Sequence, residues 1–399
     1  TLAETSDDPL VPASSRSVLV KFLSLQERQD QERKQWQALL RLQETTVAKS
    51  LSPQHVETLR RQLPSDVGVM SFFIGYEQAG VFVMSRQALR YVPLTVDLKE
   101  YQRAIQQLRV ALTNPHNDFY REPAQWLYRS VLEPGLKLLP KDVKTLVYSP
   151  DGLLSVVPLE VFMDGDRFLG ERLAIYRVPS LRYATAIQDV KAPPATWAIA
   201  CVDPDIAGSR LPFQQETGEV IKTLYGTQAV SLTGKDCTEQ NLASALHDRQ
   251  QRVFVHIGAH GVFYPSNAMD SMIWLASDNG QQSQGQAWTA KAMATVDMTP
   301  VDLVTLSSCE TGLTDPKLQR DVFGIVRALF FSGAKRVVAP LWAVHDQGTA
   351  EFMREFHAAY ARKMPAVFAL QQAQRTFIAS KKYRHPFYWS AFVLTGAAR

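Results

Sequence analysis

Two short stretches of the sequence combine residue types that can do nucleophilic chemistry. "LVTLSSCETGL" (303–313) is an apolar run that breaks into a polar turn at Cys309, and "VFVHIGAHG" (253–261) ends in His260 followed by Gly261. A thiol attacks a carbonyl as the thiolate, so it needs a nearby base and N–H groups that stabilise the tetrahedral oxygen. Taken alone, Cys309 could be a small buried core residue, a metal ligand or a nucleophile, and the buried core residue is the favoured interpretation.

The two stretches are predicted to be parallel strands that end at the same edge of a sheet. Both runs are too apolar to face water on either side, and ligands of such sheets bind beyond the carboxyl ends of the strands. The intervening residues 262–302 are enough for a hairpin and a crossover helix, so the strands can be near neighbours. His260 is then a candidate base for Cys309, and the backbone N–H groups of Gly261 and Cys309 are candidate oxyanion donors. His256 lies within its strand and is expected to be a packed core residue.

The rest of the chain supplies the elements of an α/β fold. Residues 66–94 have the pattern of a three-stranded meander, and helices are expected at 97–114 and about 122–138. "KTLVYSPDGLLSVVPLEVFM" predicts a strand, a turn and further strand-like sequence. After a linker at 188–195, apolar strands alternate with amphipathic helices, including 346–363 and 365–380, which indicates a parallel sheet covered on both faces.

Composition excludes several classes of protein. The chain of 399 residues has a net charge of +4 and no clustered run of Lys and Arg with interleaved aromatics, so direct nucleic-acid contact is not expected. No run of 18 apolar residues occurs, and the polar N-terminus has no hydrophobic core of a signal peptide, so neither a membrane span nor secretion is expected. No Gly-rich phosphate loop follows any strand, which disfavours a nucleotide-binding domain.

The three cysteines are odd in number and widely spaced. No Cys/His pairing at zinc spacing is present, so neither a structural metal site nor a disulfide framework is expected, and the pattern fits a reducing compartment such as the cytoplasm. Cys201 and Cys237 are therefore expected to be packing residues.

At this point the motifs carry a resemblance to a known family. "VFVHIGAHG", "LVTLSSCETGL", "FGIVRALFFSGAKRVVAPLWAVHDQGTAEFM" and "YRHPFYWSAFVLTG" resemble the CHAT family, caspase-like domains often linked to tetratricopeptide repeats in bacteria. Upstream, "GVFVMSRQALRYVPL" and "LVYSPDGLLSVVPLEVFM" resemble the subdomain that precedes the peptidase domain, and the likeness extends over about 66–399. The sequence departs from the family pattern in "HIGAHG" where Phe-Ala-Thr is commoner, in "LSSC" where Ala often precedes Cys, and at His345 where Asp is common.

The resemblance implies a cysteine endopeptidase of the caspase, gingipain and separase clan. His260 is then the general base and acid, Cys309 the nucleophile, and the Gly261 and Cys309 amides the oxyanion donors; no metal or organic cofactor is implied. It implies a caspase-like, mostly parallel sheet flanked by helices. The expected organisation is a disordered segment at 1–16, a helical segment at 17–65, a pseudo-peptidase subdomain at 66–187 and the peptidase domain at 195–399.

Two acidic residues are candidates for substrate binding. Asp346 follows another strand, "RVVAPLWAV", and a basic side chain of a substrate would need such a carboxylate. A helix N-cap for 347–361 is an equally good reading of Asp346. Glu216 can cap a helix or face the same cleft. Residues 277–286 are either an insertion processed during activation or a plain hairpin loop.

The expected partners are a protein or peptide substrate and a regulatory protein or repeat domain. Family membership implies control by a partner or an upstream region, often in bacterial defence, including antiviral defence, or cell death. The rival interpretation is a catalytically silent CHAT-fold scaffold or interaction module.

Overall fold

The computed structural model describes residues 53–75, 78–179, 189–247, 249, 251–264, 268–278, 285–308 and 324–396. The segment expected to be disordered, 1–16, lies outside the described residues. Of the helical segment at 17–65, only helix α3 (Pro53–Gln62) and the residues after it are described. Cys309 also lies outside them.

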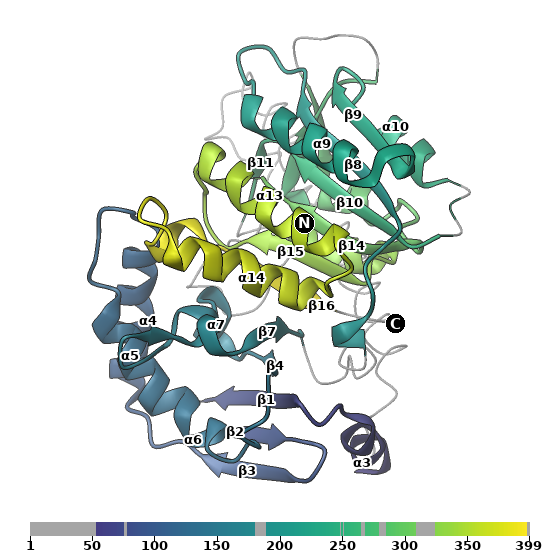
Figure 1. Ribbon diagram of the computed structural model, residues 1–399. Coiled ribbons are helices and arrows are strands. Elements are labelled where there is room, and N and C mark those ends of the chain that lie inside the picture. Colours follow the sequence, from purple (N-terminus) through teal and green to yellow (C-terminus); the bar gives the residue numbers. More distant parts are fainter. Residues whose placement is uncertain are drawn as a thin grey trace, which may run out of the picture. The chain divides into compact units, whose positions relative to one another are not determined.

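An eleven-stranded sheet, in the order β3-β2-β1-β4-β7-β16-β15-β14-β10-β8-β9, organises the described chain (Figure 1). Its strands are β1 (Val67–Ile74), β2 (Ala79–Met84), β3 (Leu89–Pro93), β4 (Thr145–Ser149), β7 (Ala174–Arg177), β8 (Trp197–Pro204), β9 (Ala229–Gly234), β10 (Val253–Gly258), β14 (Val301–Leu306), β15 (Arg336–Pro340) and β16 (Phe392–Gly396).

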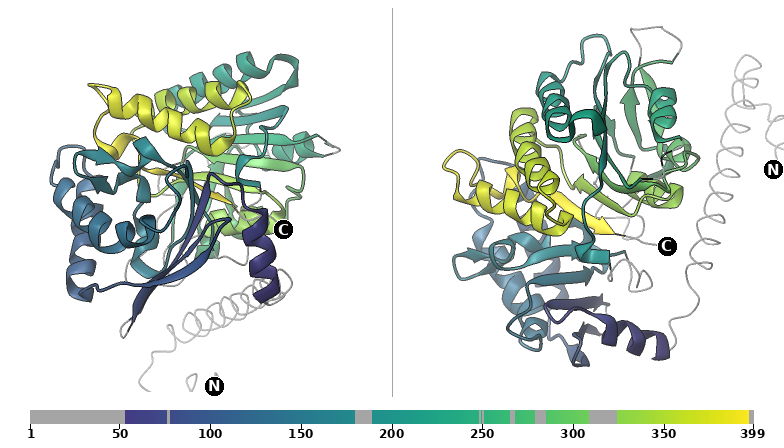
Figure 2. Two further views of the ribbon diagram at one scale, coloured as in Figure 1. Left: turned by 60° about the horizontal axis from the view of Figure 1, so that its bottom comes forward. Right: turned by 45° about the vertical axis from the view of Figure 1, so that its right-hand side comes forward.

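Most strand pairs of this sheet are parallel. The exceptions are the meander β1-β2-β3, as predicted, and β16, which returns antiparallel to β15. On its other side β16 pairs parallel with β7, where Thr395 faces Arg177. Figure 2 shows from two further directions how β7 and β16 join the early and late strands of the chain. The predicted mostly parallel α/β sheet is confirmed.

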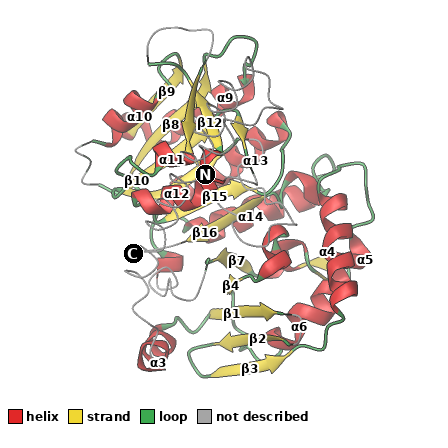
Figure 3. Ribbon diagram, turned by 180° about the vertical axis from the view of Figure 1, so that it is seen from behind, coloured by secondary structure: helices red, strands yellow, loops and turns green. Residues whose placement is uncertain are grey.

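Helices cover both faces of the late strands. One face carries α9 (Pro212–Tyr225), α13 (Asp346–Ala361) and α14 (Ala366–Ala379). The other carries α10 (Glu239–Leu246), α11 (Ala290–Met293) and α12 (Gly324–Ser332), which Figure 3 shows from behind. The early strands pack against α4 (Leu98–Leu112), α5 (Arg121–Leu127) and α6 (Glu133–Leu136), and α7 (Leu169–Arg172) lies beside α14.

Local sequence signals account for two of the helix ends. Thr238 is the N-cap of α10, where its hydroxyl accepts from the backbone N–H of Asn241 at 3.1 Å. Gly333 ends α12 with φ +117°, and a Cβ there would lie 2.8 Å from the backbone N of Thr299. Only glycine fits that position without strain.

Most of the strand-like sequence after the Pro-Asp-Gly turn does not form a strand, and only its last residue, Met163, belongs to one, the two-residue β5 (Met163–Asp164). Residues Gly152–Val156 and Leu159–Val161 form two short 3-10 turns. Pro158 lacks the N–H that a central strand needs, which separates the two turns. Most apolar side chains of these two turns are nevertheless buried. The apolar pattern therefore correctly predicted burial but did not predict the secondary structure.

Cys201 and Cys237 form a disulfide, so the expectation that they are separate packing residues is wrong. Cys201 lies on β8, opposite Leu232 of the neighbouring β9, and Cys237 follows the turn at the end of β9. Both side chains are buried. Parallel pairing of β8 with β9 brings together two cysteines that are 36 residues apart, a proximity that sequence spacing does not reveal.

A buried ionic cluster ties the amino ends of the late strands. Asp302 of β14 is 1% exposed and pairs with Arg336 of β15 and with Arg252, which precedes β10. The hydroxyl of Tyr360, on α13, also donates to Asp302 at 3.2 Å and accepts from the N–H of Ala195 at 3.0 Å. A buried carboxylate is tolerated because each oxygen has charged and hydrogen-bonded partners.

Two fully buried histidines meet beneath the carboxyl edge of the sheet. His256 of β10 bonds through Nδ1 to the hydroxyl of Thr305, at 2.8 Å, on β14. His357 of α13 packs edge-on against it, with ring centroids 4.9 Å apart. Burial lowers the pKa of His256 to about 3 and holds that of His357 well below its usual value. The expectation that His256 is a packed core residue is confirmed, and both rings are neutral in the folded protein.

This pair predicts a loss of stability in acid. Below about pH 6.5 the unfolded chain protonates both rings while the folded chain does not. Each histidine therefore lowers the free energy of unfolding by up to about 1.4 kcal/mol for every pH unit of acidification. We expect His357→Phe, which removes one such ring, to flatten this slope between about pH 6.5 and about pH 4 by close to half of the histidine contribution. Urea unfolding of both proteins across that range measures it.

The comparison of variants isolates the histidines from other buried groups. Glu160, whose pKa burial raises to about 7, titrates in the same window in every variant. His116→Gln, at an exposed histidine, is the control and should keep the slope of the unchanged protein. If the free energy of unfolding of His357→Phe falls with pH as steeply as that of the unchanged protein, the buried histidines do not cause the acid sensitivity.

Candidate functional site

His260 lies just beyond the carboxyl end of β10. The strand ends at Gly258, Ala259 is buried, and His260 itself is half-buried. Its carbonyl accepts from the N–H of Trp274 at 2.8 Å, which starts the small antiparallel sheet of β11 (Gly261–Val262), β12 (Met272–Leu275) and β13 (Gln286–Thr289). The backbone of His260 is therefore fixed by pairing on its C-terminal side.

The loop after β8 holds the imidazole of His260. Nε2 of His260 lies 3.2 Å from the carbonyl oxygen of Ser209. A carbonyl can only accept, so Nε2 carries the proton and donates it in this hydrogen bond. In the neutral ring the other nitrogen, Nδ1, then has a free lone pair and is the atom that can take a proton.

Asp203 anchors this loop, and sequence reasoning missed it. The residue is fully buried at the end of β8, at a bulge in the pairing with β9, and has the left-handed φ of +47°. Its carboxylate accepts from Nε and Nη2 of Arg210 at 3.0 and 2.5 Å and from the N–H of Leu211 at 2.6 Å. These bonds close the loop that presents the Ser209 carbonyl. The only signal in the sequence is the Asp that directly follows an apolar run in "CVDPD". Polar residues at strand ends are too common for this signal to single out Asp203.

The strand that leads to Cys309 is the immediate parallel neighbour of the strand that leads to His260. In β10 and β14, His256 faces Thr305 and Ile257 faces Leu306. The N–H of Ser307 continues the pairing by donating to the carbonyl of Ile257 at 2.9 Å. The predicted adjacency of the two strands is confirmed, and the crossover between them contains the predicted hairpin, β12–β13, and a short helix, α11. The structure describes the chain after β14 as far as Ser308.

Gly261 directs its amide away from the small sheet. Hydrogen-bonded and non-hydrogen-bonded pairs alternate along antiparallel strands. Because His260 is bonded to Trp274, the next pair, Gly261 with Ile273, is the non-hydrogen-bonded kind. The N–H of Gly261 therefore points from β11 toward the side on which no other described strand lies.

Asp346 lies at the same sheet edge and is bonded to helix α9. Its Oδ1 accepts from Nε2 of Gln214 at 3.0 Å, and Gln214 is almost completely buried. The Gln214 side chain also packs on Gly258, where a Cβ would lie 2.6 Å from its Oε1. The alternative reading of Asp346 as a helix N-cap is wrong, because His345 caps α13 through Nδ1, which accepts from the N–H of Gly348.

Glu216 is not brought together with Asp346. It lies on the exposed side of α9, two residues and so about 200° around the helix from Gln214.

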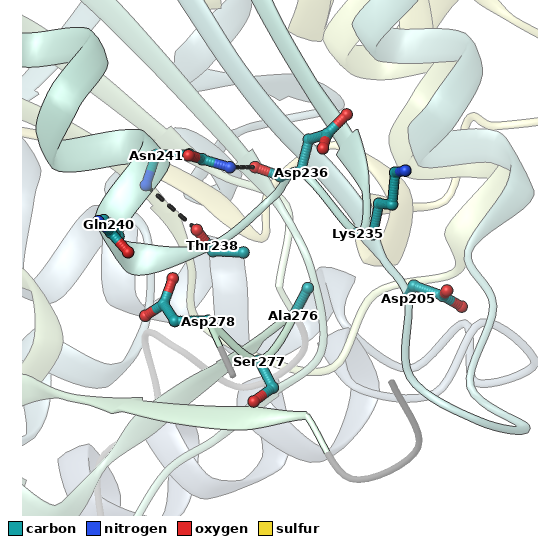
Figure 4. Close-up of a pocket in the computed structure, with 9 residues that line it drawn as sticks. All are labelled: Asp205, Lys235, Asp236, Thr238, Gln240, Asn241, Ala276, Ser277 and Asp278. Atoms are coloured by element: carbon teal, nitrogen blue, oxygen red, sulfur yellow. Dashed lines mark hydrogen bonds between the residues drawn. The ribbon is translucent and has the colours of Figure 1, made fainter. Parts of the chain in front are cut away.

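A polar pocket of about 290 Å³ lies at the start of α10, beside the segments that follow β9 and β12 (Figure 4). It is lined by Asp205, Lys235, Asp236, Thr238, Gln240, Asn241, Ala276, Ser277 and Asp278. Asn241 bonds to both Thr238 and the carbonyl of Asp236, which orders the pocket wall at the start of α10. Three carboxylates against one lysine give this part of the edge a negative charge.

Within the part of the chain that the structure describes, no group of three or more His, Cys, Asp or Glu side chains is arranged to hold a metal ion. Nor is any described helix both long and apolar enough to cross a bilayer.

The sheet order and the layered helices define a caspase-like α/β protein, and comparison with known proteins supports this class. A chain of the Saccharomyces cerevisiae separase–securin crystal structure superposes with a TM-score of 0.53 at 10% identity, covering 86% of this chain and 31% of that one. The CHAT domain family matches residues 121–397, and the protein belongs to that family.

Among curated proteins, tetratricopeptide repeat protein 28 is similar to this chain. The Homo sapiens protein is 22% identical over 346 residues, which cover 72% of this chain, and the Mus musculus protein is 22% identical over 343 residues. The matched region spans only 14% of the length of each relative.

The Asp203 anchor predicts a specific change in backbone protection. Asp203→Asn removes the charge that binds Arg210 inside a buried site, so the loop should open more often. We expect amide hydrogen exchange of peptides covering 204–211 to accelerate at least about tenfold, as read by mass spectrometry. Asp205→Asn, two residues on and without a bond to the loop backbone among the described residues, is the matched control. Equal exchange in both variants would rule out the anchor.

Proposed function

We propose that this protein is a cysteine endopeptidase that uses His260 and Cys309. His260 Nδ1 takes the thiol proton, and the thiolate of Cys309 attacks the peptide carbonyl carbon. The tetrahedral oxygen is held by the N–H groups of Gly261 and Cys309. Collapse breaks the C–N bond, His260 gives its proton to the leaving amine, and water attacks the thioester with the same histidine as base to release the acid.

The observation that carries this proposal is the orientation of the His260 ring at the shared edge of β10 and β14. The Ser209 carbonyl occupies Nε2, which leaves Nδ1 as the proton acceptor. The neighbouring strand β14 leads in sequence to Cys309, the only one of the three cysteines outside the disulfide. The direction of the Gly261 N–H and membership of the CHAT family support it further.

We propose Asp346 as the carboxylate that selects a basic substrate side chain. Its bond to the buried Gln214 fixes one oxygen and leaves the other for a guanidinium or ammonium group. Glu216 points outward from α9, and its proposed part in substrate binding is limited to residues of a substrate that extend along that helix.

The proposed setting is a bacterial cytoplasm, with activity switched by a regulatory protein or a repeat-containing region in antiviral defence or cell-death signalling. The names of the matched proteins support the partner: one relative is a tetratricopeptide repeat protein, and the fold neighbour was crystallised as a separase–securin complex. Disulfides are rare in cytoplasmic proteins, so the bond between Cys201 and Cys237 argues against the cytoplasm as the compartment.

A second candidate function is a silent CHAT-fold interaction module. Phe73, Phe82, Leu89 and Tyr91 lie on one face of the β1-β2-β3 meander and are each close to half exposed. Apolar surface of this kind is typical of a protein contact. An interaction module needs this surface but not the dyad.

Activity measurements on dyad variants separate the two functions. With a fluorogenic peptide library we expect cleavage by the unchanged protein, none by Cys309→Ala, and a fall of about 10²- to 10⁴-fold in kcat for His260→Ala. His116→Ala, at an exposed histidine, should retain full activity, and the thermal midpoint of each variant checks folding. Equal cleavage by Cys309→Ala, or no cleavage by any form with and without candidate partners, would leave the interaction module.

The proposed specificity has its own test. Asp346→Asn keeps the size and the hydrogen bond to Gln214 but removes the charge. We expect kcat/KM for substrates with Arg or Lys before the cleaved bond to fall at least about tenfold relative to those with apolar residues. Glu351→Gln, on the same helix, is the control. Retained preference for Arg and Lys would end the role proposed for Asp346.

A further inference from the structure

A second pocket, remote from His260, lies between α7 and α14. It has a volume of about 410 Å³ and is lined by Arg167, Glu171, Arg375, Ile378, Ala379 and Arg384. Arg167 of β6 (Arg167–Phe168) and Glu171 of α7 line it from the early half of the chain, and the end of α14 with Arg384 beyond it lines it from the late half. Figure 1 shows α7 and α14 side by side.

The three arginines of this pocket have no carboxylate partner among the described residues. This is a contrast with their surroundings, where Arg121 pairs with Asp166 and Arg172 pairs with Asp164. Asp164 and Asp166 are thus already paired with arginines that do not line the pocket.

Among the described residues that line the pocket, Glu171 carries the one carboxylate, and the main chain engages it. Oε2 of Glu171 accepts from the N–H of Phe168 at 2.7 Å, which fixes it at the start of α7. Arg375 is held by the same residue, because its Nε and Nη2 donate to the Glu171 carbonyl at 3.0 and 2.5 Å. One arginine is therefore pre-positioned, and three guanidinium groups against one bound carboxylate leave the pocket positively charged.

We propose that this pocket binds a small organic phosphate that carries at least two negative charges. Guanidinium groups match phosphate oxygens in geometry and remain charged at all physiological pH values. The volume is within the range of small-molecule sites. Ile378 and Ala379 provide an apolar surface for the organic part. The six lining residues enclose a concavity of about 410 Å³, a size that suits a small molecule.

The ligand would bridge two segments that are far apart in the sequence. Gln371 of α14 already donates to the carbonyl of Gly170 of α7 at 2.9 Å, next to the Arg375 contact. A phosphate that binds Arg167 and Arg384 adds a link between the same two walls. Occupancy therefore stabilises the contact between α7 and α14, independently of any catalytic activity.

Calorimetric titration of the full chain with pyrophosphate tests the proposal, at constant ionic strength and with a chelator present. We expect saturable binding by the unchanged protein and at least about tenfold weaker binding by the double variant Arg167→Gln/Arg384→Gln. Neither side chain donates to the main chain in the described residues, so the fold should persist, and thermal midpoints verify this.

The matched control is Arg90→Gln/Arg103→Gln, two exposed arginines outside the pocket that change the net charge equally. Unchanged binding by the control with loss in the pocket variant supports the site. Equal loss in both double variants shows a general charge effect, and no saturable binding by the unchanged protein shows that no site exists; either result overturns the proposal. Because binding is measured, the outcome does not depend on whether the protein is a peptidase.

Discussion

The parallel pairing of β10 with β14 is the constraint on which the rest of the structure depends. It places the ends of these two strands at one edge, and the bond between His256 and Thr305 fixes their register from within the core. A parallel pair needs a crossover, and here that crossover contributes the small sheet that holds the backbone of His260. The loop after β8, on the other flank of β10, orients the imidazole.

The early and late halves of the chain share one sheet. The family resemblance predicts a boundary between residues 187 and 195, but β7 and β16 pair directly and carry the sheet across this boundary. Helix α14 contacts both halves, with Gln371 and Arg375 bonded to the backbone of α7. The two halves are therefore coupled by hydrogen bonds and not only by the continuity of the chain.

Sequence patterns predicted the parts of this fold that depend on burial and periodicity. The apolar runs at 253–258 and 301–306 are strands, and the helices after Asp346 lie where the spacing placed them. The patterns failed where apolar residues are buried in short turns, as at Leu159–Val161. They also could not reveal contacts that arise only from strand order. The disulfide, the Asp203 anchor and the bond between Gln214 and Asp346 each join residues whose proximity depends on which strands become neighbours.

The disulfide between Cys201 and Cys237 closes a covalent ring that contains residues 202–236. This ring includes Asp203, Ser209 and all of α9, so every residue that orients His260 through the β8 loop belongs to one cyclised segment. A peptide bond hydrolysed inside the ring would leave both halves of the protein joined through sulfur. The segment that presents the imidazole would then remain attached to its strand until the disulfide is reduced.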